Sequence, residues 1–160
     1  MFKPTRWLAA VLVGALALTA VGAGVVSAKP SGKKDSGKIY AAITHQSADG
    51  KTDFIAGQGT DKLAGATAVT FAAKTSSGKP GTIPITVNPV VIYYKTGTLS
   101  GTSTVLETIN ANGTVAITNG KLTAKKGTGA LKGHSLVATV SGSGTTAAGP
   151  FVFTYTGTYK

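Results

Sequence analysis

From Ile39 to Lys160 the chain consists of short runs rich in threonine, valine and isoleucine, separated by glycine, asparagine and aspartate residues. β-Branched residues suit the pleated, half-buried surface of a sheet. No stretch combines the apolar period of a helix with capping residues at its ends. This pattern predicts an all-β domain.

Turn signals recur about every 8–12 residues, which is typical of a sandwich or a barrel. Asp49-Gly50 marks a hairpin, and Asn119-Gly120 marks a type I′ hairpin or a bulge. The connections are short and none is a long crossover, so we predict an antiparallel closed barrel of eight strands, with a β-sandwich as the alternative. Closure would also remove exposed sheet edges. The expected strands, eight to ten in number, are 39–46, 53–58, 66–75, 82–87, 90–95, 98–109, 115–118, 121–125, 134–141 and 150–159.

The N-terminus has the order of a secretory signal peptide. Lys3 and Arg6 precede an apolar run from Trp7 to Val26, and small residues follow up to Ala28. This order predicts a signal peptide over 1–28 that is cleaved after Ala28, and a secreted or periplasmic protein. The alternative is a membrane anchor, because about 20 apolar residues can span a bilayer. After cleavage we expect no membrane span, a flexible Lys/Gly/Ser-rich tail over 29–38 and one domain over 39–160.

The charge balance restricts the class of partner. The chain has 16 Lys and Arg residues against 5 acidic ones, and its only arginine is Arg6. Specific nucleic-acid readers usually rely on arginine, so we expect no specific nucleic-acid partner. The lysines predict either a solvated surface or attraction to an anionic cell-surface polymer or lipid. The chain has no cysteine, so no disulfide stabilises it.

Residues suited to catalysis are few. Ser135 follows His134 directly, and neighbours on a strand point to opposite faces, so they do not form part of a hydrolase triad. The two histidines, His45 and His134, lie in separate strands, and Asp49 and Asp53 fit a turn better than a metal site, so these residues do not make up a set of metal ligands. No phosphate-binding glycine pattern precedes a helix. We therefore expect no metal and no cofactor.

Glu107 is the one weak catalytic candidate. It lies among Val105, Leu106 and Ile109 on an expected strand, where an inward carboxyl group would have a raised pKa. The favoured alternative is that Leu106 faces inward and Glu107 faces water. With Glu107, three tyrosines are candidates for lining a ligand pocket: Tyr93, Tyr94 and Tyr155. The competing interpretation of the tyrosines is core or interface packing.

The C-terminal half, roughly 96–160, combines glycine turns with a closing aromatic strand, in the segments TLSG (98–101), NGKL (119–122), GTGALKG (127–133) and FVFTY (151–155). With these segments it resembles the allene oxide cyclase and dirigent group of β-barrels. The resemblance implies an eight-stranded antiparallel barrel with an apolar interior, often oligomeric. It carries over no activity, because the acidic and arginine residues of the plant enzymes have no counterpart that aligns here.

Three functions follow as hypotheses. The first is a non-enzymatic exported barrel that binds a small apolar ligand or associates with the cell envelope. The second is an enzyme of the cyclase or dirigent kind, which would need an inward acid or a pair of tyrosines in a pocket. The third is a lysine-rich surface module for anionic glycans or lipids. Small interior side chains, such as the alanines of the 66–75 strand, would leave room for the ligand of the first hypothesis.

Overall fold

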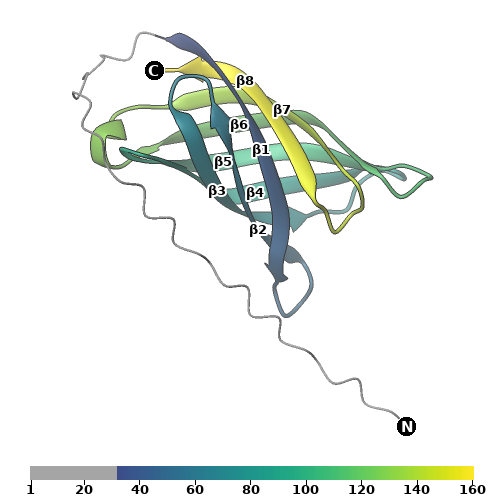
Figure 1. Ribbon diagram of the computed structural model, residues 1–160. Coiled ribbons are helices and arrows are strands. Elements are labelled where there is room, and N and C mark those ends of the chain that lie inside the picture. Colours follow the sequence, from purple (N-terminus) through teal and green to yellow (C-terminus); the bar gives the residue numbers. More distant parts are fainter. Residues whose placement is uncertain (1–31) are drawn as a thin grey trace.

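The computed structural model describes residues 32–160, which form a closed barrel of eight antiparallel strands (Figure 1). Each strand pairs with the next, and β8 closes on β1. The predicted all-β closed barrel is confirmed, and the alternative of a sandwich is wrong. The predicted signal peptide over 1–28 and its cleavage after Ala28 lie outside the described residues. The strands are β1 (Lys33–Gln46), β2 (Thr52–Asp61), β3 (Gly65–Thr75), β4 (Ile83–Tyr94), β5 (Gly97–Ile109), β6 (Val115–Gly127), β7 (Leu136–Gly144) and β8 (Phe151–Tyr159), with a 3-10 turn, η1 (Gly129–Leu131), between β6 and β7.

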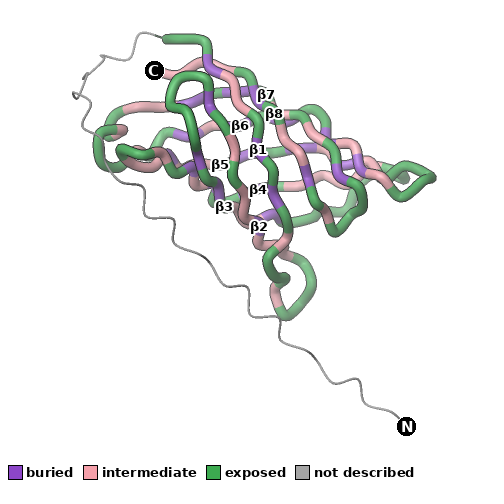
Figure 2. Tube along the Cα trace, in the orientation of Figure 1, coloured by how far each residue is buried: buried purple, intermediate pink, exposed green. Residues whose placement is uncertain are grey.

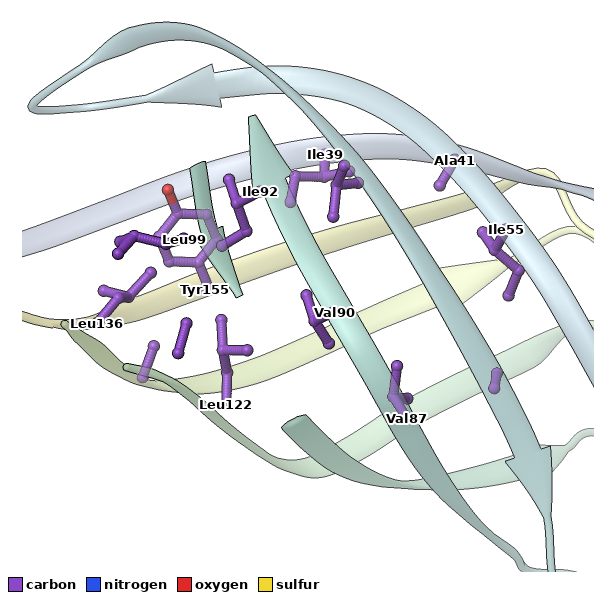
Figure 3. Packing of buried hydrophobic residues seen from close by; sticks show 14 residues of the cluster. Ile39, Ala41, Ile55, Val87, Val90, Ile92, Leu99, Leu122, Leu136 and Tyr155 are labelled. Carbon is purple, nitrogen blue, oxygen red and sulfur yellow. The ribbon is translucent and has the colours of Figure 1, made fainter. Parts of the chain in front are cut away.

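Buried and more exposed residues alternate over much of the barrel wall, because successive side chains of a strand point to opposite faces (Figure 2). In β1, Ile39 and Ala41 are buried, whereas Tyr40 and Ala42 are exposed. The inward side chains of all eight strands meet in one hydrophobic interior. Figure 3 shows Tyr155 there beside Ile92 and Leu99.

The barrel has two different ends. We call the end at which β1 begins and β8 finishes the terminal end; it carries the connections 62–64, 95–96 and 128–135. The opposite end carries the connections 47–51, 76–82, 110–114 and 145–150. In Figure 1 the C-terminus and the start of β1 lie side by side at the terminal end.

The predicted flexible tail over 29–38 is wrong from Lys33 onward. Residues 33–38 form the first half of β1 and pair with β8, from Lys33 opposite Tyr159 to Ala41 opposite Phe151. A polar segment can fill this place because the backbone supplies the ladder hydrogen bonds whatever the side chain. Gly37 fits because a Cβ atom there would collide with the Tyr155 ring.

Two expected chain breaks are bulges inside longer strands. The runs 82–87 and 90–95 form one strand, β4, whose register with β5 shifts between Val87 and Val90. The runs 115–118 and 121–125 likewise form one strand, β6, and its register with β7 shifts between Ile117 and Gly120. Asn119 has a φ of 52°, a left-handed conformation that asparagine tolerates. The bulge alternative for Asn119-Gly120 is therefore the observed one.

Candidate functional site

The barrel interior contains a cavity of about 90 Å³. Ser103 and Tyr155 are the two polar side chains that line it. Phe71 and Phe153 meet edge to face in its wall, with ring centroids 5.7 Å apart. The apolar lining residues are Ile39, Ile55, Val69, Phe71, Ala73, Ile85, Val87, Val90, Ile92, Val105, Ile117, Leu122, Val140, Phe151 and Phe153.

The alanines of β3 do not make this space, contrary to expectation. Ala66 and Ala68 are exposed on the outer face of the barrel, and Ala72 shares that face. The inward positions of β3 are Thr67, Val69, Phe71 and Ala73. Of the β3 alanines, Ala73 alone lines the cavity. Val69 and Phe71 on the inward face of β3 are bulkier than alanine, which keeps the cavity small.

Two buried aspartates and three tyrosines lie at the terminal end of the interior: Asp35, Asp61, Tyr94, Tyr155 and Tyr159. We call them the acid–tyrosine cluster. Asp35 is 2% exposed and Asp61 is 4% exposed. Asp35 comes from the start of β1, and Asp61 from the end of β2. Tyr94 and Tyr159 are the last residues of β4 and β8, and Tyr155 lies in the middle of β8, so the barrel closure itself assembles the cluster.

Asp61 is the centre of the cluster. One of its carboxylate oxygens, Oδ1, accepts hydrogen bonds from the backbone N–H groups of Leu63 at 2.8 Å and Ala64 at 2.7 Å. The other, Oδ2, accepts from the hydroxyls of Tyr155 at 2.5 Å and Tyr94 at 3.4 Å. Four donors thus hold this carboxylate, as a buried charge requires.

Asp35 lies against Asp61 and has a strongly perturbed carboxyl group. Burial raises its pKa to about 6, and the negative charge of Asp61 and a hydrogen bond to it act in the same direction. Two neighbouring buried carboxyl groups do not both ionise easily, so below about pH 6 the pair holds a proton. Burial and the negative charge of Asp61 also raise the pKa of Tyr94, Tyr155 and Tyr159, which keeps these phenols neutral.

Tyr155 connects the cluster to the cavity. Its ring lines the cavity wall, while its hydroxyl donates to Asp61. A phenol that donates its proton to a carboxylate keeps lone pairs with which it can accept another hydrogen bond. The cavity therefore has an apolar body and one polar group that is anchored by a carboxylate.

Glu107 faces the interior, and the expectation that it faces water is wrong. It is 9% exposed, whereas Leu106 lies on the outer side of β5 and is half-buried. Burial raises the pKa of Glu107, and the negative charge of Asp53 adds to this effect. Asp53 accepts a hydrogen bond from Gln46 Nε2 at 2.6 Å. Glu107 is one inward position beyond Val105, toward the opposite end, and does not line the cavity.

The predicted pocket residues thus have different places. Tyr155 lines the cavity. The hydroxyl of Tyr94 donates to the same oxygen of Asp61 as the hydroxyl of Tyr155 does. Tyr93 lies on the outer surface, 42% exposed, with its hydroxyl 3.3 Å from Thr70 Oγ1; its assignment to a pocket is corrected. Sequence reasoning missed Asp35 and Asp61, because one lies in a polar segment and the other resembles an ordinary turn aspartate.

Within residues 32–160, no three or more His, Cys, Asp or Glu side chains are grouped as a metal site would need. The same residues contain no helix of sufficient length and hydropathy to cross a membrane. Comparison of the chain with protein-family models, with curated proteins and with solved structures gives no match.

Proposed function

We propose that this protein is an exported β-barrel that binds a small, largely apolar molecule in its interior cavity. The observation that carries the proposal is a space of about 90 Å³ with apolar walls and a single anchored phenol, Tyr155. Ligand sites typically combine such a wall with a few polar groups that fix orientation. The signal-like order of residues 1–28 supports export.

The volume limits the ligand. A dry apolar cavity of about 150 Å³ accommodates benzene or xenon, so the smaller space here suits a group of a few non-hydrogen atoms. At a ceiling of about 1.5 kcal/mol per such atom, a four-atom ligand would bind with a Kd of tens of micromolar at best. A tighter ligand would have to be larger and displace Phe71 or Phe153.

The test compares binding of xenon, a single atom, by the wild-type protein, by Ala73→Leu and by Ala68→Leu. Ala73 lines the cavity, and Ala68 is an exposed alanine of the same strand, so the two variants add the same atoms inside and outside. We expect saturable xenon-induced shifts in NMR spectra for wild type and Ala68→Leu, and none for Ala73→Leu. No saturable binding to the wild type, or equal binding to Ala73→Leu, would refute the proposal.

Native mass spectrometry of the protein purified from its own host would identify a natural ligand. A mass excess that denaturation removes is the expected result, and the released compound defines the chemistry. A mass equal to that of the chain alone, together with a failed xenon titration, would leave a filled barrel with no ligand role.

A second candidate function is an enzyme of the cyclase or dirigent kind, which the sequence resembles in its C-terminal half. The inward acids and the Tyr94 and Tyr155 pair beside the cavity favour it, because an enzyme of this kind needs such groups. Tyr155→Phe separates the two functions once a ligand is known. A binder would lose at most about tenfold in affinity, as expected for one hydrogen bond to a neutral group, whereas an enzyme that uses this hydroxyl in proton transfer would lose about 10²- to 10⁴-fold in turnover.

A further inference from the structure

The charges of the barrel are separated between inside and outside. All 13 lysines of residues 32–160 are exposed. Of the five acidic residues in the same range, Asp35, Asp61 and Glu107 are buried and Asp53 is half-buried, which leaves Asp49 as the exposed one. The outer surface is therefore more basic than the composition alone indicates. The lysines are Lys33, Lys34, Lys38, Lys51, Lys62, Lys74, Lys79, Lys95, Lys121, Lys125, Lys126, Lys132 and Lys160.

Most of these lysines lie at one end of the barrel. Eight belong to segments of the terminal end, and we call them the lysine ring: Lys33, Lys34, Lys62, Lys95, Lys125, Lys126, Lys132 and Lys160. The opposite end has three, Lys51, Lys74 and Lys79, and it also has the exposed Asp49. The two acids of the terminal end, Asp35 and Asp61, are buried inside the barrel and do not neutralise the ring at the surface.

The ring comes from separate parts of the chain. Its members lie at the start of β1, at the end of β6, after β8 and in the three connections of the terminal end (Figure 1). A linear polyanion usually binds along a positively charged stripe or groove of a protein. Lysines around one end of a rigid barrel can instead contact a flat surface at the same time. An anionic bilayer is such a surface, and it attracts each nearby lysine by about 1 kcal/mol.

An exposed apolar side chain stands within the ring. Leu63 is 45% exposed in the connection 62–64, directly after Lys62. The backbone N–H groups of Leu63 and Ala64 are fixed by Asp61, so the buried carboxylate orders this projecting connection. Lysine beside an apolar side chain is the combination that interfacial membrane binding uses.

We propose that the terminal end of the barrel docks on an anionic lipid bilayer, with the lysine ring against the phosphate headgroups and Leu63 at the interface. Lysine suits this role because loose contact with many phosphates needs point charges and not the bidentate geometry of arginine. Docking in this orientation leaves the opposite end, with Glu107 and Asp53, toward the solution. The inference is independent of whether the cavity binds a ligand.

The first experiment is sedimentation of the full chain with vesicles of phosphatidylcholine containing phosphatidylglycerol, and with phosphatidylcholine alone. The test variant is Lys62→Gln/Lys95→Gln/Lys132→Gln, and the matched control is Lys51→Gln/Lys74→Gln/Lys79→Gln. Both remove three charges from exposed positions, so they differ only in the end of the barrel that they change. Circular dichroism checks that both are folded.

We expect binding to the anionic vesicles only, weakened by added salt. The test variant should bind on the order of 10- to 100-fold more weakly, and the control should stay within a few-fold of wild type. Equal loss in both variants would show that net charge alone is responsible and would overturn the proposal. Absence of vesicle binding together with retention on heparin or polyphosphate would also overturn it, in favour of a polymer partner.

The second experiment tests the orientation. The chain has no cysteine, so Leu63→Cys and Ala111→Cys each give one labelling site for a polarity-sensitive fluorophore. Residue 111 lies in the connection 110–114 at the opposite end. A blue shift on vesicle binding at position 63 and none at position 111 is the expected result. A shift at position 111 alone, or at neither position, would contradict docking through the terminal end.

Discussion

The fold disfavours the charged form of the Asp35 carboxyl group. Its pKa is raised from 3.8 to about 6, chiefly by burial. Between these two values the native state holds a proton that the unfolded state has lost. The contribution of this group to stability is therefore present at pH 4 and is lost as the pH rises toward 6 and beyond. This direction is opposite to that of an ordinary salt-bridged aspartate.

Replacing Asp35 by Asn removes this penalty. At about 1.4 kcal/mol per pKa unit, we expect Asp35→Asn to raise the free energy of unfolding at pH 7 by up to about 3 kcal/mol, and to change it little below pH 4. Urea titrations at several pH values measure the difference. Asp49→Asn is the control and should lower the free energy of unfolding at pH 7, because hydrogen bonds from Ser47 and Lys51 stabilise the charged form of Asp49 and lower its pKa. An equal loss of stability at both pH values in Asp35→Asn would contradict the argument.

The hydroxyl of Tyr155 satisfies a buried carboxylate oxygen. In Tyr155→Phe, Asp61 Oδ2 would keep only the longer hydrogen bond from Tyr94, at 3.4 Å. We expect a loss of about 1–3 kcal/mol at pH 7. The matched change Tyr93→Phe removes a hydroxyl on the outer surface and should cost less than about 0.5 kcal/mol. Similar losses in the two variants, measured by chemical denaturation, would show that the Tyr155 hydrogen bond has no special weight.

Strand β1 is longer than its hydrophobic part. Lys33 to Lys38 pair with β8, and from Gly37 onward β1 also pairs with β2. We therefore expect amide hydrogens of this segment to exchange slowly, together with those of the rest of β1. Hydrogen exchange followed by NMR tests this. Exchange at the rate of an unstructured peptide in residues 33–38, with protection beginning only at Ile39, would support the flexible tail expected from composition.

Elements with alternating apolar residues could be predicted from the sequence, because alternation is local information. Each expected run corresponds to a strand or to part of one, and the order of the strands follows from the short connections. The bulges do not, because Asn119-Gly120 allows positive φ in a hairpin turn and in a bulge alike. The acid–tyrosine cluster could not be predicted from the sequence. The burial of Asp35 depends on Tyr155 and Asp61, and these residues come close together only when β8 closes on β1. Glu107 was misplaced because Leu106 beside it is the more apolar residue.

Closure of the barrel determines both the charge distribution and the position of the acid–tyrosine cluster. A closed sheet has one interior, and the buried acids of this barrel lie in that interior, while the lysines lie outside. The same closure brings the beginning of β1 beside the end of β8 at the terminal end (Figure 1). Ring and cluster therefore occupy the same end, one on the surface and one beneath it. A change in the proton count of the cluster also changes the potential at the ring.

The closed topology also predicts where the chain can be cut. Because Lys33 pairs with Tyr159, a short Gly/Ser linker can join residue 160 to residue 32. New termini between Ala111 and Asn112 fall in an exposed connection whose hydrogen bonds are local, so this permutant should keep the barrel. A second permutant opened between Asn119 and Gly120 interrupts β6 in the middle of its ladders with β5 and β7, and we expect it not to fold cooperatively. Circular dichroism and thermal unfolding distinguish them. Cooperative folding of the 119/120 permutant and failure of the 111/112 permutant would mean that Asn119-Gly120 is a true chain turn and that the strand order is different.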